Sequence, residues 1–323
     1  MNGPTAFQSG RPMRLWAAME APLTDTAIRP DEDTPQGLAL AGSAYILWGL
    51  LPLYLKLVSH LPVTEVLTHR VLWALPIAGA VLVASRRTVD LRTALADRRT
   101  LLMAGLTALL LSVNWGIYVY AIATDRALDA ALGYYVNPLF SMMLGAILLG
   151  ERLRGSQLIA VGLAALAVLI LFLDAARPPW IALGLTGSWG IYAYFKKSLP
   201  VGPNQGFFLE VLMLLPIAVI YLGWLTAQGE SHFLATGTDT LLLLGCGLVT
   251  AVPLLFYANG AKLLRLSTIA ILQYIVPTMV FAIAVTLFDE VMGRARMVAF
   301  PLIWAALVIY TVPLVRRMRR PPR

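Results

Sequence analysis

The chain has 323 residues, of which 59% are hydrophobic and only 13% charged, a balance that water-soluble domains do not show. A single cysteine and three scattered histidines argue against a disulfide framework and against a metal site. The net charge of +8 does not predict nucleic-acid binding, because the basic residues fall between apolar segments. The composition therefore predicts an all-α polytopic membrane protein without metal or cofactor.

Residues 1–37 are polar and rich in proline and acidic residues, and they contain no apolar signal-peptide segment. We expect a disordered tail there. Met13 and Met19 are alternative start sites, between which the sequence does not decide.

Ten apolar segments follow the tail. Each is close to the roughly 20 residues that a helix needs to cross a bilayer, so we predict ten transmembrane helices and no soluble domain. The segments are 38–58, 62–84, 100–123, 128–149, 156–173, 179–196, 204–226, 240–259, 267–288 and 296–315.

The basic residues predict the orientation. Of the 25 lysines and arginines, 19 fall in segments on the N-terminal side of the membrane and four on the opposite side. Because cytoplasmic loops carry the excess of Lys and Arg, both termini are predicted to be cytoplasmic, including the basic tail 316–323.

An internal repeat divides the chain. Four residues, Leu75-Pro76-Ile77-Ala78, recur at a shift of 140 as Leu215-Pro216-Ile217-Ala218. We therefore expect five-helix halves at 38–174 and 175–315. Because five is odd, the halves are inverted about an axis in the membrane plane. A shift of 139 superposes Val113/Val252, Tyr118/Tyr257, Arg126/Arg265, Ala131/Ala270, Tyr135/Tyr274, Pro138/Pro277, Leu148/Leu287 and Glu151/Glu290.

The segment 128–149 carries a small or polar stripe at every fourth residue, formed by Gly133, Asn137, Ser141 and Gly145. Pro138 lies within it and leaves a backbone carbonyl without a helical partner. Pro277 is its equivalent in the second half. We expect helix kinks at both prolines, whose free carbonyls face a cavity; the alternative is a pair of kinked packing helices.

Several motifs resemble one transporter family. They include Tyr45-x-x-Trp48-Gly49-x-x-Pro52, Thr68-His69-Arg70, Asn114-Trp115, Gly133-Tyr134-Tyr135-Val136-Asn137-Pro138 and Leu149-Gly150-Glu151-Arg152. Over residues 38–315 the chain resembles RarD-type permeases, in the EamA branch of the drug/metabolite transporter (DMT) superfamily. The resemblance implies ten helices, inner-membrane location and permease activity, under a name tied to chloramphenicol sensitivity. Asp289-Glu290 departs from the commoner Gly-Glu pair, and the N-terminal tail is longer than usual.

Aromatic and amide side chains are candidate substrate ligands. Tyrosines suit an amphipathic or aromatic solute, although they also anchor helices at membrane interfaces. Both roles are open for Tyr120 and Tyr135 as well. Asparagine and glutamine suit hydrogen bonding to a solute, although they also join helices. The candidates are Asn114, Tyr118, Tyr134, Asn137, Tyr257, Asn259, Gln273 and Tyr274.

Four charged or titratable residues inside apolar segments are candidates for charge pairing and gating. Glu65 and His69 stand at i and i+4 on one helix face, as a proton-sensing pair or as an interfacial hydrogen bond. Arg70 and Glu210 are equivalent in the two halves. We expect either a cross-half charge pair that an anionic or zwitterionic solute breaks, or local pairing, for example of Arg70 with Glu65.

These features predict a secondary transporter for a small molecule, working by alternating access in the inner membrane. There is no phosphate-binding glycine loop and no catalytic motif. The alternatives are a passive channel and an intramembrane enzyme that uses Glu65 and His69 on a lipid-linked substrate. Proton coupling, the substrate, the direction of transport and the oligomeric state stay open.

Overall fold

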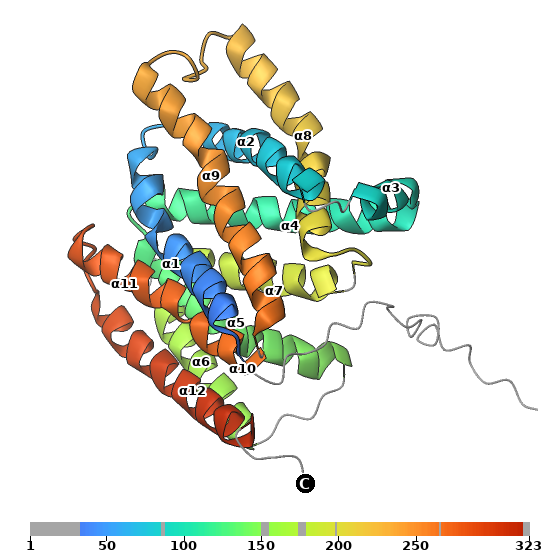
Figure 1. Cartoon of the computed structure of the whole chain (residues 1–323). Helices are drawn as coiled ribbons and strands as arrows, with labels where there is room; N and C mark the ends of the chain where they lie inside the picture. The colour runs from blue at the N-terminus through green and yellow to red at the C-terminus, as the bar shows by residue number, and fades with distance from the viewer. Residues whose placement is uncertain are drawn as a thin grey trace, which may run out of the picture.

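The computed structural model describes residues 33–84, 88–149, 155–173, 179–197, 199–264 and 266–318. Within these ranges the secondary structure is helical (Figure 1). Most of the predicted N-terminal tail lies outside the described residues, as does the end of the C-terminal tail. The helices are α1 Pro35–Leu57, α2 Val63–Ala84, α3 Thr88–Ala96, α4 Arg98–Ala123, α5 Ala127–Leu149, α6 Gly155–Leu173, α7 Trp180–Lys197, α8 Pro203–Ala227, α9 Gly237–Gly260, η2 Ala261–Leu263, α10 Leu266–Leu272, α11 Ile275–Thr286 and α12 Arg294–Met318.

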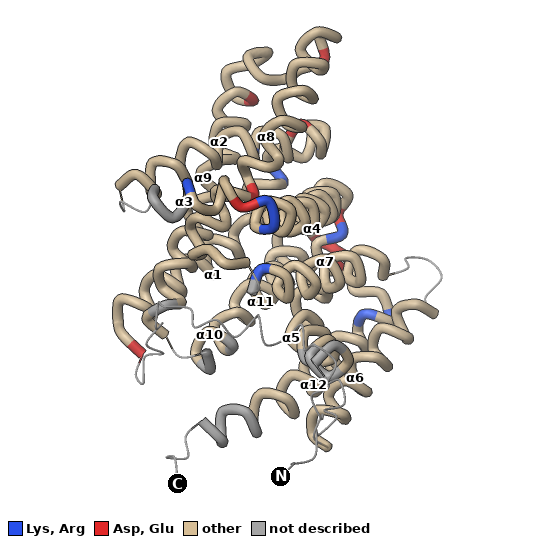
Figure 2. Tube along the Cα trace, turned by 90° about the vertical axis from the view of Figure 1, so that its right-hand side faces the viewer, with Lys and Arg blue, Asp and Glu red and all other residues tan. Residues whose placement is uncertain are grey.

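Seven helices in the described part of the chain are long and apolar enough to cross a membrane. They are α1, α2, α4, α6, α8, α9 and the Arg294–Val312 part of α12, and α11 is a shorter apolar helix. Figure 2 shows how few charged residues interrupt these helices. This arrangement is that of a multi-pass membrane protein, because in hydrocarbon only a helix or a closed barrel satisfies its own backbone groups.

Local sequence explains where several helices begin. The Thr34 hydroxyl accepts a hydrogen bond from the Gly37 amide at 3.0 Å, ahead of Pro35 at the first helical position. Asp97 accepts from the Thr100 amide at 3.0 Å and starts α4. The Thr236 hydroxyl accepts from the Asp239 amide at 3.0 Å and starts α9. These caps set the chain's re-entry into each apolar segment.

The helices of the two predicted halves pack mainly against each other. In Figure 1, α1 lies on α9 and α11, and α7 lies correspondingly on α4 and α5. Likewise α2 packs on α9, as α8 packs on α4, whereas α2–α8, α5–α11 and α6–α12 pair each helix with its own equivalent. The main contacts therefore join one predicted half to the other.

Close packing of α5 on α7 depends on Gly133, from the predicted small-residue stripe. A Cβ at this position would lie 2.9 Å from the Ala182 carbonyl oxygen. The Gly133 carbonyl also accepts a hydrogen bond from the Thr186 hydroxyl at 2.9 Å. The glycine therefore lets two backbones approach, which is how membrane helices gain packing contacts.

The two prolines do not act alike. Helix α5 runs unbroken through Pro138, whereas the segment predicted at 267–288 divides into α10 and α11. The break falls at Gln273 and Tyr274, so Pro277 is the third residue of a new helix. The expectation of two equivalent kinks is wrong in this respect: the N–H that Pro277 lacks is one that the first turn of a helix leaves unpaired.

Candidate substrate site

A buried arginine links the two halves near the middle of the bundle. Arg70 of α2 is 3% exposed, and its Nε donates to the Thr250 hydroxyl of α9 at 2.9 Å. The Thr250 hydroxyl donates in turn to the Cys246 carbonyl at 2.7 Å. The guanidinium carbon lies 4.5 Å from the ring centroid of Trp115 on α4, a cation–π distance. Helices from both halves therefore hold Arg70 in place.

The charge of Arg70 is uncompensated in the described part of the molecule. No carboxylate there forms an ion pair with it, and its Nη1 has no hydrogen-bond partner. The polar groups that interact electrostatically with the guanidinium are neutral: Cys246, Tyr134, Tyr118 and Tyr54. Burying a charge without a partner is costly, so this position favours an incoming anionic group.

Further unsatisfied polar atoms lie on α4 and α5, the helices whose Tyr118 and Tyr134 interact with this arginine. The rings of Tyr118 and Tyr134 are 5.5 Å apart in an edge-to-face arrangement. The Tyr118 hydroxyl is buried without a hydrogen-bond partner, as is Oδ1 of Asn137, one helical turn beyond Tyr134. Together with Arg70 these atoms offer a cationic donor, a hydroxyl and an amide acceptor. Of the predicted substrate ligands, Tyr118, Tyr134 and Asn137 are the ones that the structure places near this charge or on the helix beside it.

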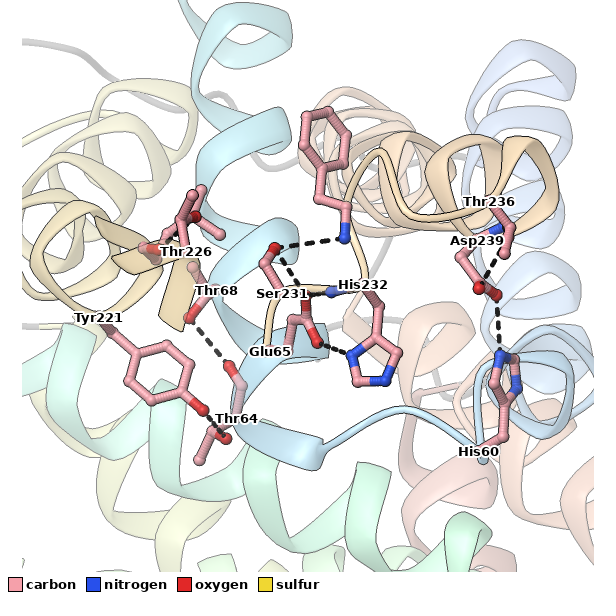
Figure 3. Close-up of polar contacts among 12 residues, drawn as sticks. His60, Thr64, Glu65, Thr68, Tyr221, Thr226, Ser231, His232, Thr236 and Asp239 are labelled. Atoms are coloured by element: carbon pink, nitrogen blue, oxygen red, sulfur yellow. Dashed lines mark hydrogen bonds and ion pairs between the residues drawn. The ribbon is translucent and has the colours of Figure 1, made fainter. Parts of the chain in front are cut away.

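Glu65 does not pair with His69. Its fully buried carboxylate accepts from the backbone amide of His232 at 2.8 Å and from His232 Nδ1 at 2.7 Å (Figure 3). His69 Nδ1 instead accepts from the indole N–H of Trp73 at 2.9 Å. The expected pair is replaced because the α8–α9 loop brings three donors to one carboxylate, the His232 amide, the His232 ring and the Ser231 hydroxyl, whereas an i,i+4 neighbour offers one.

Glu210 does not pair with Arg70 either. Its carboxylate lies 2.7 Å from Nζ of Lys196, near the end of α7, and accepts from the Tyr192 hydroxyl at 3.4 Å. Gly206 makes room for the lysine, because a Cβ there would lie 2.9 Å from that Nζ. The pair is local to the second half, so the expected cross-half charge pair is absent from this conformation.

Comparison with known proteins identifies the family. The sequence model of the EamA-like transporter family matches residues 35–173. Protein RarD of Streptomyces exfoliatus is 41% identical over 294 residues, which cover 91% of this chain and 93% of that one. The chain belongs to the EamA-like transporter family. An uncharacterized transporter of Vibrio cholerae serotype O1 is 39% identical over 285 residues, or 88% of this chain and 94% of the relative.

A solved crystal structure supports the fold alone. It matches this EamA-family chain with a TM-score of 0.54 and 19% identity, covering 87% of this chain and 98% of that one. Membership makes the protein a RarD-type permease of the DMT superfamily, a transporter rather than an enzyme. A membrane permease acts on a small molecule and lies in a lipid bilayer.

Other predicted ligands of this permease make contacts between or within helices. Asn114 donates to the Leu185 carbonyl at 3.1 Å and to the Ser188 hydroxyl at 2.9 Å, joining α4 to α7. Asn259 donates to the Leu255 carbonyl of its own helix at 2.7 Å. Both amides are therefore occupied in this conformation, so a role in substrate binding would require them to exchange partners.

The remaining candidates, Gln273 and the tyrosines other than Tyr118 and Tyr134, lie in separate places. Tyr257 packs edge-to-face on Tyr45 of α1, with ring centroids 5.7 Å apart, and lies beside Trp48. Gln273 and Tyr274 form the break between α10 and α11. The remaining two tyrosines make contacts of other kinds: Tyr120 is 40% exposed beside Trp180, and the Tyr135 hydroxyl is 2.9 Å from that of Thr278. These positions do not converge on Arg70.

A cavity of about 510 Å³ lies at one end of the EamA bundle, away from Arg70. At its wall Asp129 pairs with Arg126 and Arg296, each at 2.7 Å. The Glu290 carboxylate accepts from the Ala127 and Leu128 amides at 2.5 and 3.1 Å, which caps the start of α5. This cavity borders ionic and capping contacts between the halves.

Sequence reasoning missed Trp115, Thr250, Lys196 and His232 as partners of the charged residues. Trp115 belonged to a recognised motif, but its contact with Arg70 depends on how α4 meets α2. Lys196 was one of the 19 basic residues assigned to the cytoplasmic side, so nothing in the sequence indicated that it would lie at a buried carboxylate. No signal in the sequence marks Thr250 or His232 as the partner of a buried charge.

Proposed function

We propose that the protein is a secondary transporter that moves a small anionic or zwitterionic solute across the inner membrane by alternating access. The observation that carries the proposal is the buried, unpaired guanidinium of Arg70, held between α2, α4 and α9. A carboxylate or phosphate oxygen bound to Nη1 supplies the missing partner. Tyr118 and Asn137 offer further hydrogen bonds to the same solute.

The packing of the halves supports alternating access. The main helix contacts join one half to the other, so rocking of the halves exposes a site between them to each side in turn. Thr250 comes from the second half and Trp115 from the first, so this motion changes the surroundings of Arg70. The break at Gln273 and Tyr274 provides backbone that is not held in a continuous helix.

The proposed topology has ten crossings in two inverted halves, 38–174 and 175–315, with both termini cytoplasmic. A reporter active only in the cytoplasm is expected to be active after Arg320 and silent near Gly229. The opposite result would overturn the orientation drawn from the basic residues.

Neither alternative gains support from the described contacts. An intramembrane enzyme would need Glu65 and His69 to share a proton, but they hydrogen-bond to different groups. A passive channel would show neither saturation nor counterflow.

The test is binding and counterflow with Arg70→Gln, Arg70→Lys and, as control, the exposed Arg294→Gln. A thermal-shift screen of carboxylates, phosphorylated metabolites, zwitterions and amphenicols first identifies a ligand, since binding raises the melting temperature. We expect Arg70→Gln to lower affinity by roughly 30-fold or more, as loss of one partner of a buried charge pair costs about 2–5 kcal/mol. The unliganded variant should be at least as stable as wild type, because it no longer buries an unpaired charge. Loss of stability with unchanged binding would instead make Arg70 structural.

A further inference from the structure

Two histidine–carboxylate contacts join the halves at the end of the bundle where α1 ends and α9 begins. His60 Nε2, in the α1–α2 loop, lies 2.8 Å from Asp239 Oδ1 on α9. His232 Nδ1, in the α8–α9 loop, lies 2.7 Å from Glu65 Oε2 on α2 (Figure 3). Each half thus supplies one histidine and one carboxylate. We call these two contacts the outer latch.

The contacts around the outer latch also cross between the halves. Glu65 accepts from the His232 amide at 2.8 Å and from the Ser231 hydroxyl at 3.3 Å, which fixes the α8–α9 loop over the start of α2. Beside it the Thr64 and Tyr221 hydroxyls lie 2.6 Å apart, joining α2 to α8. Opening this end of the permease must therefore break both histidine contacts.

The latch lies directly above the Arg70 site along α9. Asp239, Cys246 and Thr250 stand on this one helix, with seven residues or about 10 Å of rise between the first two. Thr250 binds Arg70, and Cys246 is a buried neighbour of the same arginine. Separating α9 from the α1–α2 loop thus opens a route from this end to the proposed solute site.

We propose that the outer latch is a proton-controlled gate, which protonation of His60 and His232 holds closed and deprotonation releases. This inference rests on the proposed function and on its topology, which places the latch outside. Imidazole changes its charge between pH 5 and 8, and an imidazolium binds a carboxylate more strongly than neutral imidazole does. The closed state therefore binds protons more tightly than the open state. By linkage, external acid favours the closed state.

Other ionisable groups that face the latch do not reverse this sign. His69 on α2 feels the charge of Glu65, and His232 adds a second positive charge near Asp239 when protonated. The charge of His232 favours the association with Asp239, and burial disfavours a charged His69 that would compete with His232 for Glu65. Further ionisable side chains close to the latch in space or in sequence are Tyr54 and Lys56 of α1, Tyr221 of α8 and Glu230 of the α8–α9 loop.

The opposite end of the molecule lacks the titrating carboxylates at the equivalent positions. The shift of 140 that superposes the Leu-Pro-Ile-Ala motifs places Gln205 opposite Glu65, and the shift of 139 places Thr100 opposite Asp239. Neither Gln nor Thr changes charge with pH. The equivalent positions at the other end therefore cannot form a histidine–carboxylate latch of this kind.

The experiment uses Cys246, the only cysteine in the chain, as a reporter of opening. Purified protein in sealed liposomes is exposed externally to a membrane-impermeant sulfonated thiosulfonate at pH 5.5 and 7.5. The labelling rate of each variant is divided by that of wild type at the same pH, which cancels the intrinsic reactivity of the thiol. The variants are His60→Gln/His232→Gln and Glu65→Gln/Asp239→Asn. The control, Asp125→Asn, breaks a contact with Lys56 at the same end but within one half.

Both double variants should label at least about threefold faster than wild type at pH 5.5 and less than about twofold faster at pH 7.5, since a hydrogen bond from imidazolium to a carboxylate is roughly twice as strong as one from neutral imidazole. The labelling rate of the control, divided by that of wild type, should stay near one at both pH values. An equal ratio at both pH values, or the same change in Asp125→Asn, overturns the latch. Labelling needs no solute, so such a failure leaves the transport result for Arg70→Gln standing, and a transport failure leaves the latch result standing.

Discussion

The Lys196 ammonium lies 2.7 Å from the Glu210 carboxylate, so the buried acid of α8 is neutralised by its own half and not by Arg70. Glu210 is fully buried, whereas the lysine side chain is 23% exposed. The lysine side chain extends from near the end of α7 to a buried carboxylate that would be costly to leave unpaired. This arrangement leaves Arg70 available to a solute.

Removing either member of the Lys196–Glu210 pair is expected to destabilise the protein. Lys196→Met should lower the free energy of unfolding by about 3–5 kcal/mol, since it leaves a buried carboxylate without its partner. The reversed pair Lys196→Glu/Glu210→Lys should recover part of that loss. Thermal unfolding in detergent measures both. In contrast, Arg70→Glu/Glu210→Arg should be no more stable than the worse single variant, and repair by this swap would show that Arg70 and Glu210 interact.

Glu290 is expected to make stability depend on pH. Burial raises the pKa of Glu290 above its ordinary value, although the Ala127 and Leu128 amides oppose this. Below the unfolded value, about 4.3, its contribution to stability is fully present, and it is lost as pH rises through the raised folded value. Glu290→Gln should flatten this part of the profile, whereas Glu290→Ala should lose the cap of α5, at about 1–2 kcal/mol. Melting temperatures measured between pH 4 and 7 test this, with the neighbouring Asp289→Asn as control. If the melting temperature of Glu290→Gln changed with pH as steeply as that of wild type, the pH dependence would not come from Glu290.

Gly133→Ala is expected to lower stability by about 1–3 kcal/mol, because its Cβ would meet the Ala182 carbonyl and push α5 from α7. The matched control is Gly162→Ala, where a Cβ meets no atom within 4 Å. The control should be neutral or slightly stabilising, since alanine favours helix. Equal melting temperatures for the two variants would show that this close approach does not matter.

Pro138→Ala and Pro277→Ala are expected to insert normally and to transport more slowly. Alanine at 138 restores a donor for the Tyr134 carbonyl beside the proposed site. Alanine at 277 supplies a donor that lets α10 and α11 join into one helix across Gln273. Counterflow in liposomes, normalised to the amount inserted, measures the effect. Wild-type counterflow rates in both variants would show that the prolines serve helix packing and not transport.

The sequence by itself determined the class, the helices and the family. Apolar segments near 20 residues become helices because backbone groups in hydrocarbon have no other partners, and that condition is local. The described helices accordingly fall on the predicted segments, with α3 added between the second and third and the ninth segment divided. Gly133 was also predictable, since its spacing on one helix face follows from helix geometry alone.

Only the tertiary structure decided the partners of the charges. Glu65 and His69 share a face of α2, yet the α8–α9 loop brings His232 to the carboxylate. Arg70 and Glu210 are equivalent in the repeat, yet Glu210 pairs with Lys196 and Arg70 packs over the ring of Trp115. Hydrogen bonds and ion pairs form within about 3 Å, so a charge takes the donor that folding brings nearest. Which donor comes nearest depends on how loops and helices far apart in the sequence pack together, and helix periodicity does not predict that packing.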